Sequence, residues 1–225
     1  MQGCGHPKFL PTLRQYLRDN KSDVVGLVEP CISGLRADRV IHHVVSPTLI
    51  ALKHRDSHEV FGFAATLIYG SPNASKRKPL WSNVSSLASN INQPWLLFGY
   101  FNATLSTDDR MGCAPSTKPC STFRQLLFEL DLRDMGFSGQ NFTWHRGLVH
   151  ARLDHFLCNT YWDQAFPESL ISHLLRMRSD HWPMLLQVGH LPSHSSKTLP
   201  ILRLYSCVIS MALGIVGAFL VCFHL

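Results

Sequence analysis

Hydrophobic residues recur along the first third of the chain with helical and then strand-like spacing. Three leucines lie three and four positions apart within residues 9–20, with charged residues between them, which predicts an amphipathic helix packed on a sheet. Residues 23–30, DVVGLVEP, predict a short buried strand that ends at proline. The apolar runs 48–53 and 60–69 flank the polar turn HRDSHE, so we expect a β-hairpin there.

The middle of the chain predicts alternating helices and strands. The turn-rich segment 71–79, SPNASKRKP, precedes residues 80–91, where four apolar side chains fit one helical face. The apolar run 94–102, PWLLFGYFN, predicts a buried strand. Residues 106–122 are polar and contain Gly and Pro, so we expect a long loop, followed by a helix over 121–132 with its first serine as the cap.

The remaining segments complete the prediction of a single domain with a tail. Residues 141–159 and 179–188 alternate short strand-like runs with turns. Strands that first alternate with helices and then pair through hairpins predict a two-sheet core with helices outside. We therefore expect a domain over residues 1–188, a linker over 189–203 and an apolar tail over 204–225.

The apolar tail has two interpretations. It contains about 22 residues without Asp, Glu, Lys or Arg, close to the length that crosses a bilayer core. One interpretation is a transmembrane segment that anchors the protein, with Arg203 on the cytoplasmic side. The other is a C-terminus that is apolar without entering a membrane. The sequence favours neither.

Charge and cysteine content narrow the class of protein. A chain of 225 residues with 45% hydrophobic content can bury one sizeable core. Its net charge of +6 favours a polyanionic partner such as DNA, although solubility explains such a charge equally well. The seven cysteines are odd in number and lack C-x-x-C spacing, which argues against a zinc site or a disulfide framework. With no apolar run typical of a secretory signal, we expect an intracellular, reducing location and no obligate protein partner.

Five motifs occur in a fixed order after VVGLVEP. Together they resemble the serial motifs of the endonuclease domain in plant LINE-type retrotransposons, a branch of the endonuclease/exonuclease/phosphatase (deoxyribonuclease I-like) proteins. The resemblance covers about residues 4–188. Five ordered motifs are specific, whereas SDH or LDH alone would not be. The motifs are IYGSPNAS at 68–75, GYFNATLS at 99–106, DMGFSGQNFTW at 134–144, RLDHFLCN at 152–159 and SDHWPMLL at 179–186.

The resemblance implies an α/β fold, a four-layer α/β/β/α sandwich, and Mg²⁺-dependent hydrolysis of a DNA phosphodiester in the nucleus. Such cleavage needs a hard cation, a polarised water and a group that stabilises the leaving oxygen. By the family's pattern, Glu29 and Asp180 correspond to Mg²⁺-binding carboxylates. The catalytic positions correspond to His181 and Tyr69 beside the phosphate, Asp154 orienting the His181 ring, and Asn102 positioning the nucleophile.

Substrate binding rests on weaker signals. The cations Lys76, Lys78 and Arg178 are candidate DNA contacts, although a run such as KRK is usually a solvated loop. Trp144 is a candidate substrate-facing aromatic, but a buried core tryptophan explains it as well.

Departures from the family pattern predict an impaired enzyme. Tyr100 stands where the family has the Asp of G-D-F-N, and a phenol, with an ordinary pKa of about 10, is a poor base at pH 7. We also expect the fold to be incomplete. The family's first strand, which ends W-N, and a glycine-rich strand pair after residues 37–41 have no counterpart in the sequence, which predicts weak stability.

Three hypotheses of different classes remain. The first is an endonuclease with full or residual activity. The second is a non-catalytic remnant that still binds nucleic acid, and the third is a membrane-tethered product whose domain is inert.

Overall fold

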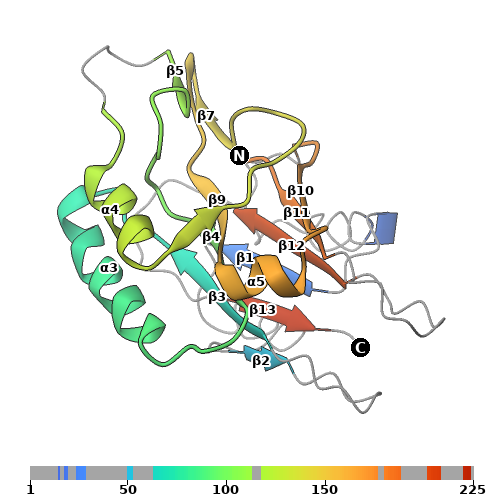
Figure 1. Ribbon diagram of the computed structural model, residues 1–225. Coiled ribbons are helices and arrows are strands. Elements are labelled where there is room, and N and C mark those ends of the chain that lie inside the picture. The colour runs from blue at the N-terminus through green and yellow to red at the C-terminus, as the bar shows by residue number, and fades with distance from the viewer. Residues whose placement is uncertain are drawn as a thin grey trace, which may run out of the picture.

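The computed structural model describes the backbone of Gln15, Arg18, Asp19 and residues 24–28, 50–52, 63–112, 118–176, 180–188, 202–208 and 220–223. Gln15, Arg18 and Asp19 are helical, consistent with the helix expected over residues 9–20. The described strands gather into three sheets (Figure 1).

The first sheet has the strand order β10-β11-β12-β1-β13. Its strands are β1 (Val24–Val28), β10 (Leu170–His173), β11 (Met184–Val188), β12 (Leu202–Val208) and β13 (Leu220–Phe223). β1 is parallel to β12, whereas β11 is antiparallel to both β10 and β12. The predicted strand at residues 23–30 is therefore confirmed as β1.

The second sheet has the order β2-β3-β4-β9-β6. It is built from β2 (Ile50–Leu52), β3 (Phe63–Tyr69), β4 (Trp95–Tyr100), β6 (Leu132–Asp134) and β9 (Asp154–Asn159). β2 and β3 are antiparallel, which confirms the predicted hairpin pairing. Every residue of β4 is buried, as expected for a central strand covered on both faces.

A small third sheet has the order β5-β8-β7. It consists of β5 (Arg110–Met111), β7 (Trp144–Arg146) and β8 (Val149–Ala151). Three helices complete the described elements, α3 (Ala74–Ala88), α4 (Ser121–Glu129) and α5 (Thr160–Ala165).

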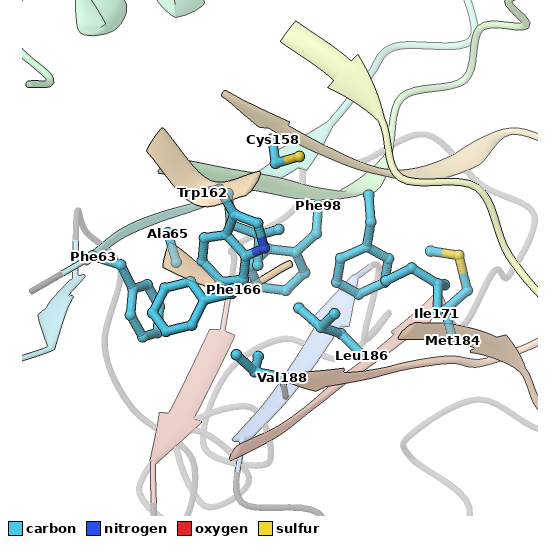
Figure 2. Close-up of a cluster of buried hydrophobic side chains, with 12 residues drawn as sticks. Phe63, Ala65, Phe98, Cys158, Trp162, Phe166, Ile171, Met184, Leu186 and Val188 are labelled. Carbon is cyan, nitrogen blue, oxygen red and sulfur yellow. The ribbon is translucent and has the colours of Figure 1, made fainter. Parts of the chain in front are cut away.

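Side chains of β4 divide the core into two layers because successive residues of a strand point to opposite faces. Leu96 and Phe98 belong to one cluster, which joins β3, β4 and β9 to Ile171 of β10 and to Leu186 of β11 (Figure 2). The first two sheets therefore pack face to face.

The other face of the second sheet is covered by helices. Leu97 of β4 packs in a second cluster with Trp81 and Val84 of α3 and with Phe123 and Leu126 of α4. Figure 1 shows both helices on this side, opposite the first sheet. The described layers thus run helices, sheet, sheet.

Two helix boundaries differ from the sequence prediction. α3 begins at Ala74, inside the segment expected to be a turn, because the Asn73 side chain accepts a hydrogen bond from the amide of Ser75 and caps the helix. Pro79 lies inside α3, where it removes one helical hydrogen bond.

At the other helix, Cys120 occupies the cap position and its side chain makes no capping hydrogen bond to the backbone, so the prediction of Ser121 as the cap was wrong. The helix ends at Glu129. Leu132 enters β6 because it packs in the core between the sheet and the helices.

Two parts of the predicted linker and tail are strands. β12 lies between β11 and β1, and β13 pairs with the other side of β1. Across the described residues, none of the helices has the length and hydropathy needed to span a bilayer. An uncharged apolar run suits a buried strand as well as a membrane helix, and periodicity alone does not separate the two.

Candidate active site

Three strands of the second sheet bring polar side chains to one edge. Tyr69 at the end of β3 pairs with Tyr100 at the end of β4, and Tyr100 pairs with Asp154 at the start of β9. Tyr100 follows Leu96 and Phe98 at even spacing, and its register therefore directs it toward the first sheet. The edge residues thus line one end of the space between the two sheets.

The first sheet contributes a histidine to this end. Nδ1 of His181, three residues before β11, donates a hydrogen bond to Oδ2 of Asp154 over 2.9 Å. Both side chains are 1% exposed. A carboxylate only accepts hydrogen bonds, so this contact fixes the proton on Nδ1 and the orientation of the ring.

Thr143 holds the carboxylate end of this pair in place. Its hydroxyl oxygen accepts hydrogen bonds from the amides of Leu153 and Asp154 at 2.9 and 3.0 Å. Thr143 is fully buried, so no solvent competes for these bonds. Sequence reasoning missed this residue because a threonine within FTW carries no signal of its own.

Tyr100 packs directly against His181. The two rings meet edge to face at 87° with centroids 4.8 Å apart, and the Tyr69 ring lies 5.8 Å from Tyr100 on another side. A phenol ring thus fills the space beside the imidazole at the position where the resembling family has a carboxylate. Tyr100 is 9% exposed.

Asn102 lies just beyond the same strand. Its backbone is left-handed, with φ 52°, and its side-chain amide donates to the carbonyl of Gly70 at 3.4 Å. Gly70 follows Tyr69 directly, and its own amide donates to the carbonyl of Tyr100. Asn102 therefore belongs to the edge that carries both tyrosines.

Asp180 and Trp144 form a second contact beside His181. The indole Nε1 of half-buried Trp144 donates to Oδ2 of Asp180 at 3.1 Å, and Trp144 forms an antiparallel bridge with His181. Trp144 also packs on the cluster of Tyr100, Ala151 and Leu153. Trp144 is therefore a partly buried residue of this cluster, and its contact with a substrate stays a prediction.

The carboxylates leave two oxygens that suit a cation. Oδ1 of Asp154 and Oδ1 of Asp180 are buried and have no hydrogen-bond partner among the residues that the structure describes. A buried carboxylate oxygen without a donor is costly unless a cation satisfies it, and oxygen donors are the ligands that Mg²⁺ prefers. Each oxygen is thus of the type that a hard cation binds, but the described segments contain no group of three or more His, Cys, Asp or Glu side chains that could hold one.

The remaining predicted residues divide into two groups. Lys76 and Lys78 are exposed on α3, whereas Arg77 between them is buried and donates to the carbonyls of Ser71 and Pro72. Glu29 and Arg178 lie outside the described residues.

The strand that precedes Glu29 in the sequence does reach the relevant edge. Val28, the last residue of β1, pairs with Val208, and Ser206 of β12 pairs with Met184. The carboxyl end of β1 therefore lies at the same edge of the first sheet as the start of β11, three residues after His181.

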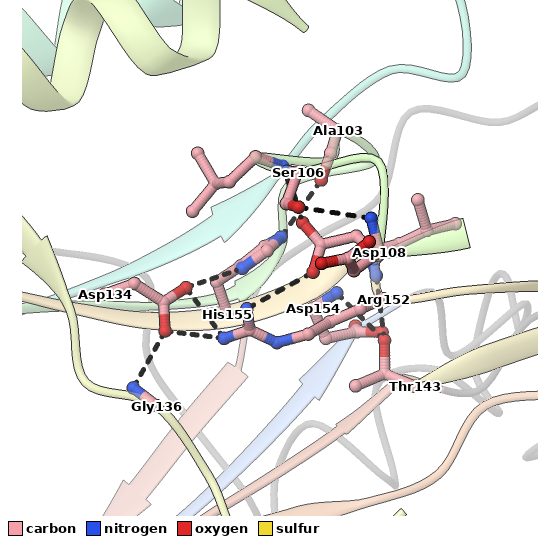
Figure 3. Close-up of polar contacts among 12 residues, drawn as sticks. Ala103, Ser106, Asp108, Asp134, Gly136, Thr143, Arg152, Asp154 and His155 are labelled. Carbon is pink, nitrogen blue, oxygen red and sulfur yellow. Dashed lines mark hydrogen bonds and ion pairs between the residues drawn. The ribbon is translucent and has the colours of Figure 1, made fainter. Parts of the chain in front are cut away.

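A separate charged cluster lies on the opposite face of β9. His155 is fully buried, with Nδ1 3.0 Å from Oδ2 of Asp134 and Nε2 3.0 Å from the carbonyl oxygen of Ala103 (Figure 3). Arg152 donates to both oxygens of Asp134 at 2.6 and 2.7 Å. Both ring nitrogens of His155 face acceptors, so both bonds form only when both nitrogens carry protons.

Electrostatics in this cluster favour the carboxylate form of Asp134. Burial alone would raise the pKa of this carboxyl, but the hydrogen bonds and positive charges of His155 and Arg152 outweigh burial and hold its pKa well below the usual value. The cluster contacts β9 on the side that faces the helices. His155 lies there next to Asp154, the residue that accepts the hydrogen bond from His181.

Comparisons with known proteins bear on the fold. No protein-family model and no curated protein matches the sequence. The structure is similar to that of the 3′ phosphatase NExo from Neisseria bound to a product DNA hairpin, with a TM-score of 0.55 and 18% identity over 80% of this chain and 94% of that chain. NExo belongs to the endonuclease/exonuclease/phosphatase fold.

The chain has the deoxyribonuclease I-like fold.

This assignment confirms the deoxyribonuclease I-like fold class predicted from the sequence. The expected loss of the first strand and of an internal strand pair stays a prediction. At 18% identity the similarity extends to the fold alone. Within the deoxyribonuclease I-like fold, the cluster around Asp154 and His181 lies at one end of the sandwich, between the two sheets.

Proposed function

We propose that this chain is a retroelement-derived, DNA endonuclease-like protein that hydrolyses phosphodiesters with Mg²⁺ and whose activity is reduced by Tyr100. The observation that carries the proposal is the buried pair of His181 and Asp154, which joins the two sheets at one end of the sandwich. The deoxyribonuclease I-like fold supports it. The five ordered motifs support a LINE-type origin.

In this proposal His181 contacts the scissile phosphate through Nε2. Asp154 keeps the Nδ1 proton in place, and a second proton on Nε2 makes the ring a cation paired with a carboxylate. A positioned cation stabilises negative charge on the phosphate more effectively inside a protein than in water, because the local dielectric constant is lower. Asn102 and Tyr69, from the same edge, position the phosphate and the attacking water.

Asp180 and Glu29 would hold Mg²⁺. The buried Oδ1 of Asp180 has no hydrogen-bond partner among the described residues, and Trp144 holds the other oxygen of that carboxylate. Bound Mg²⁺ supplies positive charge that neutralises the phosphate as the bond breaks. Trp144 therefore positions Asp180, in addition to any contact that it makes with DNA.

Tyr100 accounts for the expected weakness of the enzyme. Its ring packs against His181. At this position the resembling family has a carboxylate, which would align the attacking water. Loss of a positioned general base typically costs about 10²- to 10⁴-fold in rate. Residual activity would then come from His181, Asn102 and charge neutralisation.

The DNA contacts proposed here are electrostatic and not sequence-specific. Lys76 and Lys78 are exposed on α3, the helix that starts four residues after Gly70, and Arg178 is proposed from its place beside the SDH motif. Arg77 makes no such contribution, because its guanidinium is buried against the chain itself.

A plasmid assay tests the proposal. Purified full-length protein is expected to convert supercoiled plasmid to the nicked form in Mg²⁺, and not in EDTA. His181→Ala should abolish nicking, while Gln125→Ala, on the exposed face of α4, should leave it unchanged. If folded wild-type protein does not nick but binds DNA with an affinity that falls steeply with salt, the chain is a nucleic-acid-binding remnant. Nicking that survives His181→Ala would refute the assignment of the site.

A further inference from the structure

Two histidines face each other across the hairpin of β7 and β8. His145 pairs in register with His150, and the two strands are joined by the turn residues Gly147 and Leu148. Gly147 has φ 61°, the left-handed conformation that a two-residue hairpin turn with glycine in its first position requires. The turn therefore fixes the register that places the two imidazoles side by side.

The two rings have the spacing of a chelating pair. Their planes differ by 20° and their centroids are 5.7 Å apart. Two imidazoles that bind one cation through nitrogens at about 2.0–2.1 Å bring their ring centres to roughly 5–6 Å. Directly opposed residues on antiparallel strands have Cβ atoms about 4.5–5.5 Å apart, which is close enough for one cation to reach both rings.

The surroundings of the His145 ring also favour metal binding. Its ring packs edge to face on Trp182 at 5.2 Å. Its Nε2 atom is buried without a hydrogen-bond partner among the described residues. A buried ring nitrogen without a partner costs free energy that a metal–nitrogen bond would recover.

We propose that His145 and His150 form a binding site for a late first-row divalent cation such as Zn²⁺ or Cu²⁺. Imidazole nitrogen selects these metals, whereas the carboxylate oxygens of Asp154 and Asp180 suit Mg²⁺. Two protein ligands leave the other coordination positions to water. The site adjoins the proposed catalytic residues, because the amide of His145 donates to the carbonyl of Asp180, but metal binding there is measured without nuclease activity.

Copper titration of the full-length protein tests this site. Cu²⁺ added in the presence of millimolar Mg²⁺ should fill a site whose electron paramagnetic resonance spectrum shows two coordinating imidazole nitrogens. Because linking two ligands raises affinity by about 10²- to 10⁴-fold, His150→Gln should weaken this site by about 100-fold or more. His145→Gln should weaken it equally, and the double variant should lose little more.

Arg146→Gln is the matched control, because it removes a cation from the same hairpin and leaves both imidazoles in place. It should retain the site. His150 is half-buried, so His150→Gln is expected to fold, and its thermal unfolding without metal should match that of the wild type. Unchanged copper affinity in His150→Gln, or loss in only one of the two single variants, would overturn the proposal.

Discussion

Asp154 and His181 lie 27 residues apart in the chain and flank different sheets, yet Oδ2 of Asp154 accepts a hydrogen bond from Nδ1 of His181 over 2.9 Å. The pair forms because β9 starts at Asp154 and β11 starts shortly after His181, and the two strands pack in one core cluster. Its geometry is therefore set by the packing of the two sheets. Substitutions that disturb β9 should affect both stability and the proposed site.

Thr143→Val should lower the free energy of unfolding by about 2–4 kcal/mol. The substitution removes the acceptor of two buried amides, those of Leu153 and Asp154, and a buried amide left unpaired costs about 1–3 kcal/mol. Thr143→Ser keeps the hydroxyl and should cost only about 1 kcal/mol for the lost methyl group. Urea denaturation of the three proteins measures the difference. Equal losses in both variants would show that the hydroxyl is not important.

Gly99→Ala should destabilise the protein by more than about 3 kcal/mol. Gly99 has φ +121°, and a Cβ atom there would lie 2.5 Å from the carbonyl oxygen of Ile68 in the neighbouring strand. Gly136→Ala is the control, since Gly136 has φ +70° with no atom within 4 Å of the added carbon. It should cost only about 1–2 kcal/mol. Thermal unfolding of both variants tests whether β3 and β4 lie this close to each other at Gly99.

Acid should remove the contribution of Asp134 to stability. Because the pKa of Asp134 is lower in the folded protein than its ordinary value of 3.8, its contribution is complete above that value. The contribution declines as the pH falls toward the depressed folded pKa. Asp134→Asn should therefore be less stable than the wild type by about 3 kcal/mol at pH 7, because it removes the carboxylate that pairs with Arg152 and His155 and leaves Arg152 only the longer ion pair with Asp109. The gap should narrow below about pH 4.

Urea denaturation from pH 7 to pH 2 measures this dependence. Asp108→Asn provides the control, since Asp108 is exposed, and its stability should follow the wild-type curve. A difference between Asp134→Asn and wild type that stays constant to pH 2 would contradict the proposed charge interactions.

Periodicity predicted the elements that carry the site. The alternation and apolar runs around Tyr69, Tyr100 and Asp154 gave the strands β3, β4 and β9, and motif order gave the fold class. The register between these strands could not be predicted, because it depends on long-range pairing. That register is what aligns the three residues at one edge.

Other features left no local signal in the sequence. Arg77 belongs to a charged run that resembles a solvated loop, and only the capping of α3 by Asn73 turns that segment into a helix with Arg77 buried. The cluster of Asp134, Arg152 and His155 draws on two strands that are neighbours only in the sheet. The apolar tail over 204–225, which contains β13 and most of β12, suits a membrane as well as a sheet, so its sequence did not decide between the two.

The central claim is that the residues around His181 still form a nuclease site and that Tyr100 limits its activity. Tyr100→Asp restores a carboxylate beside the imidazole, so the most direct measurement is the Mg²⁺-dependent plasmid nicking rate of Tyr100→Asp relative to wild type. We expect an increase of about 10²-fold or more, which is lost again when His181→Ala is added. A folded Tyr100→Asp protein that nicks no faster than wild type would contradict the claim.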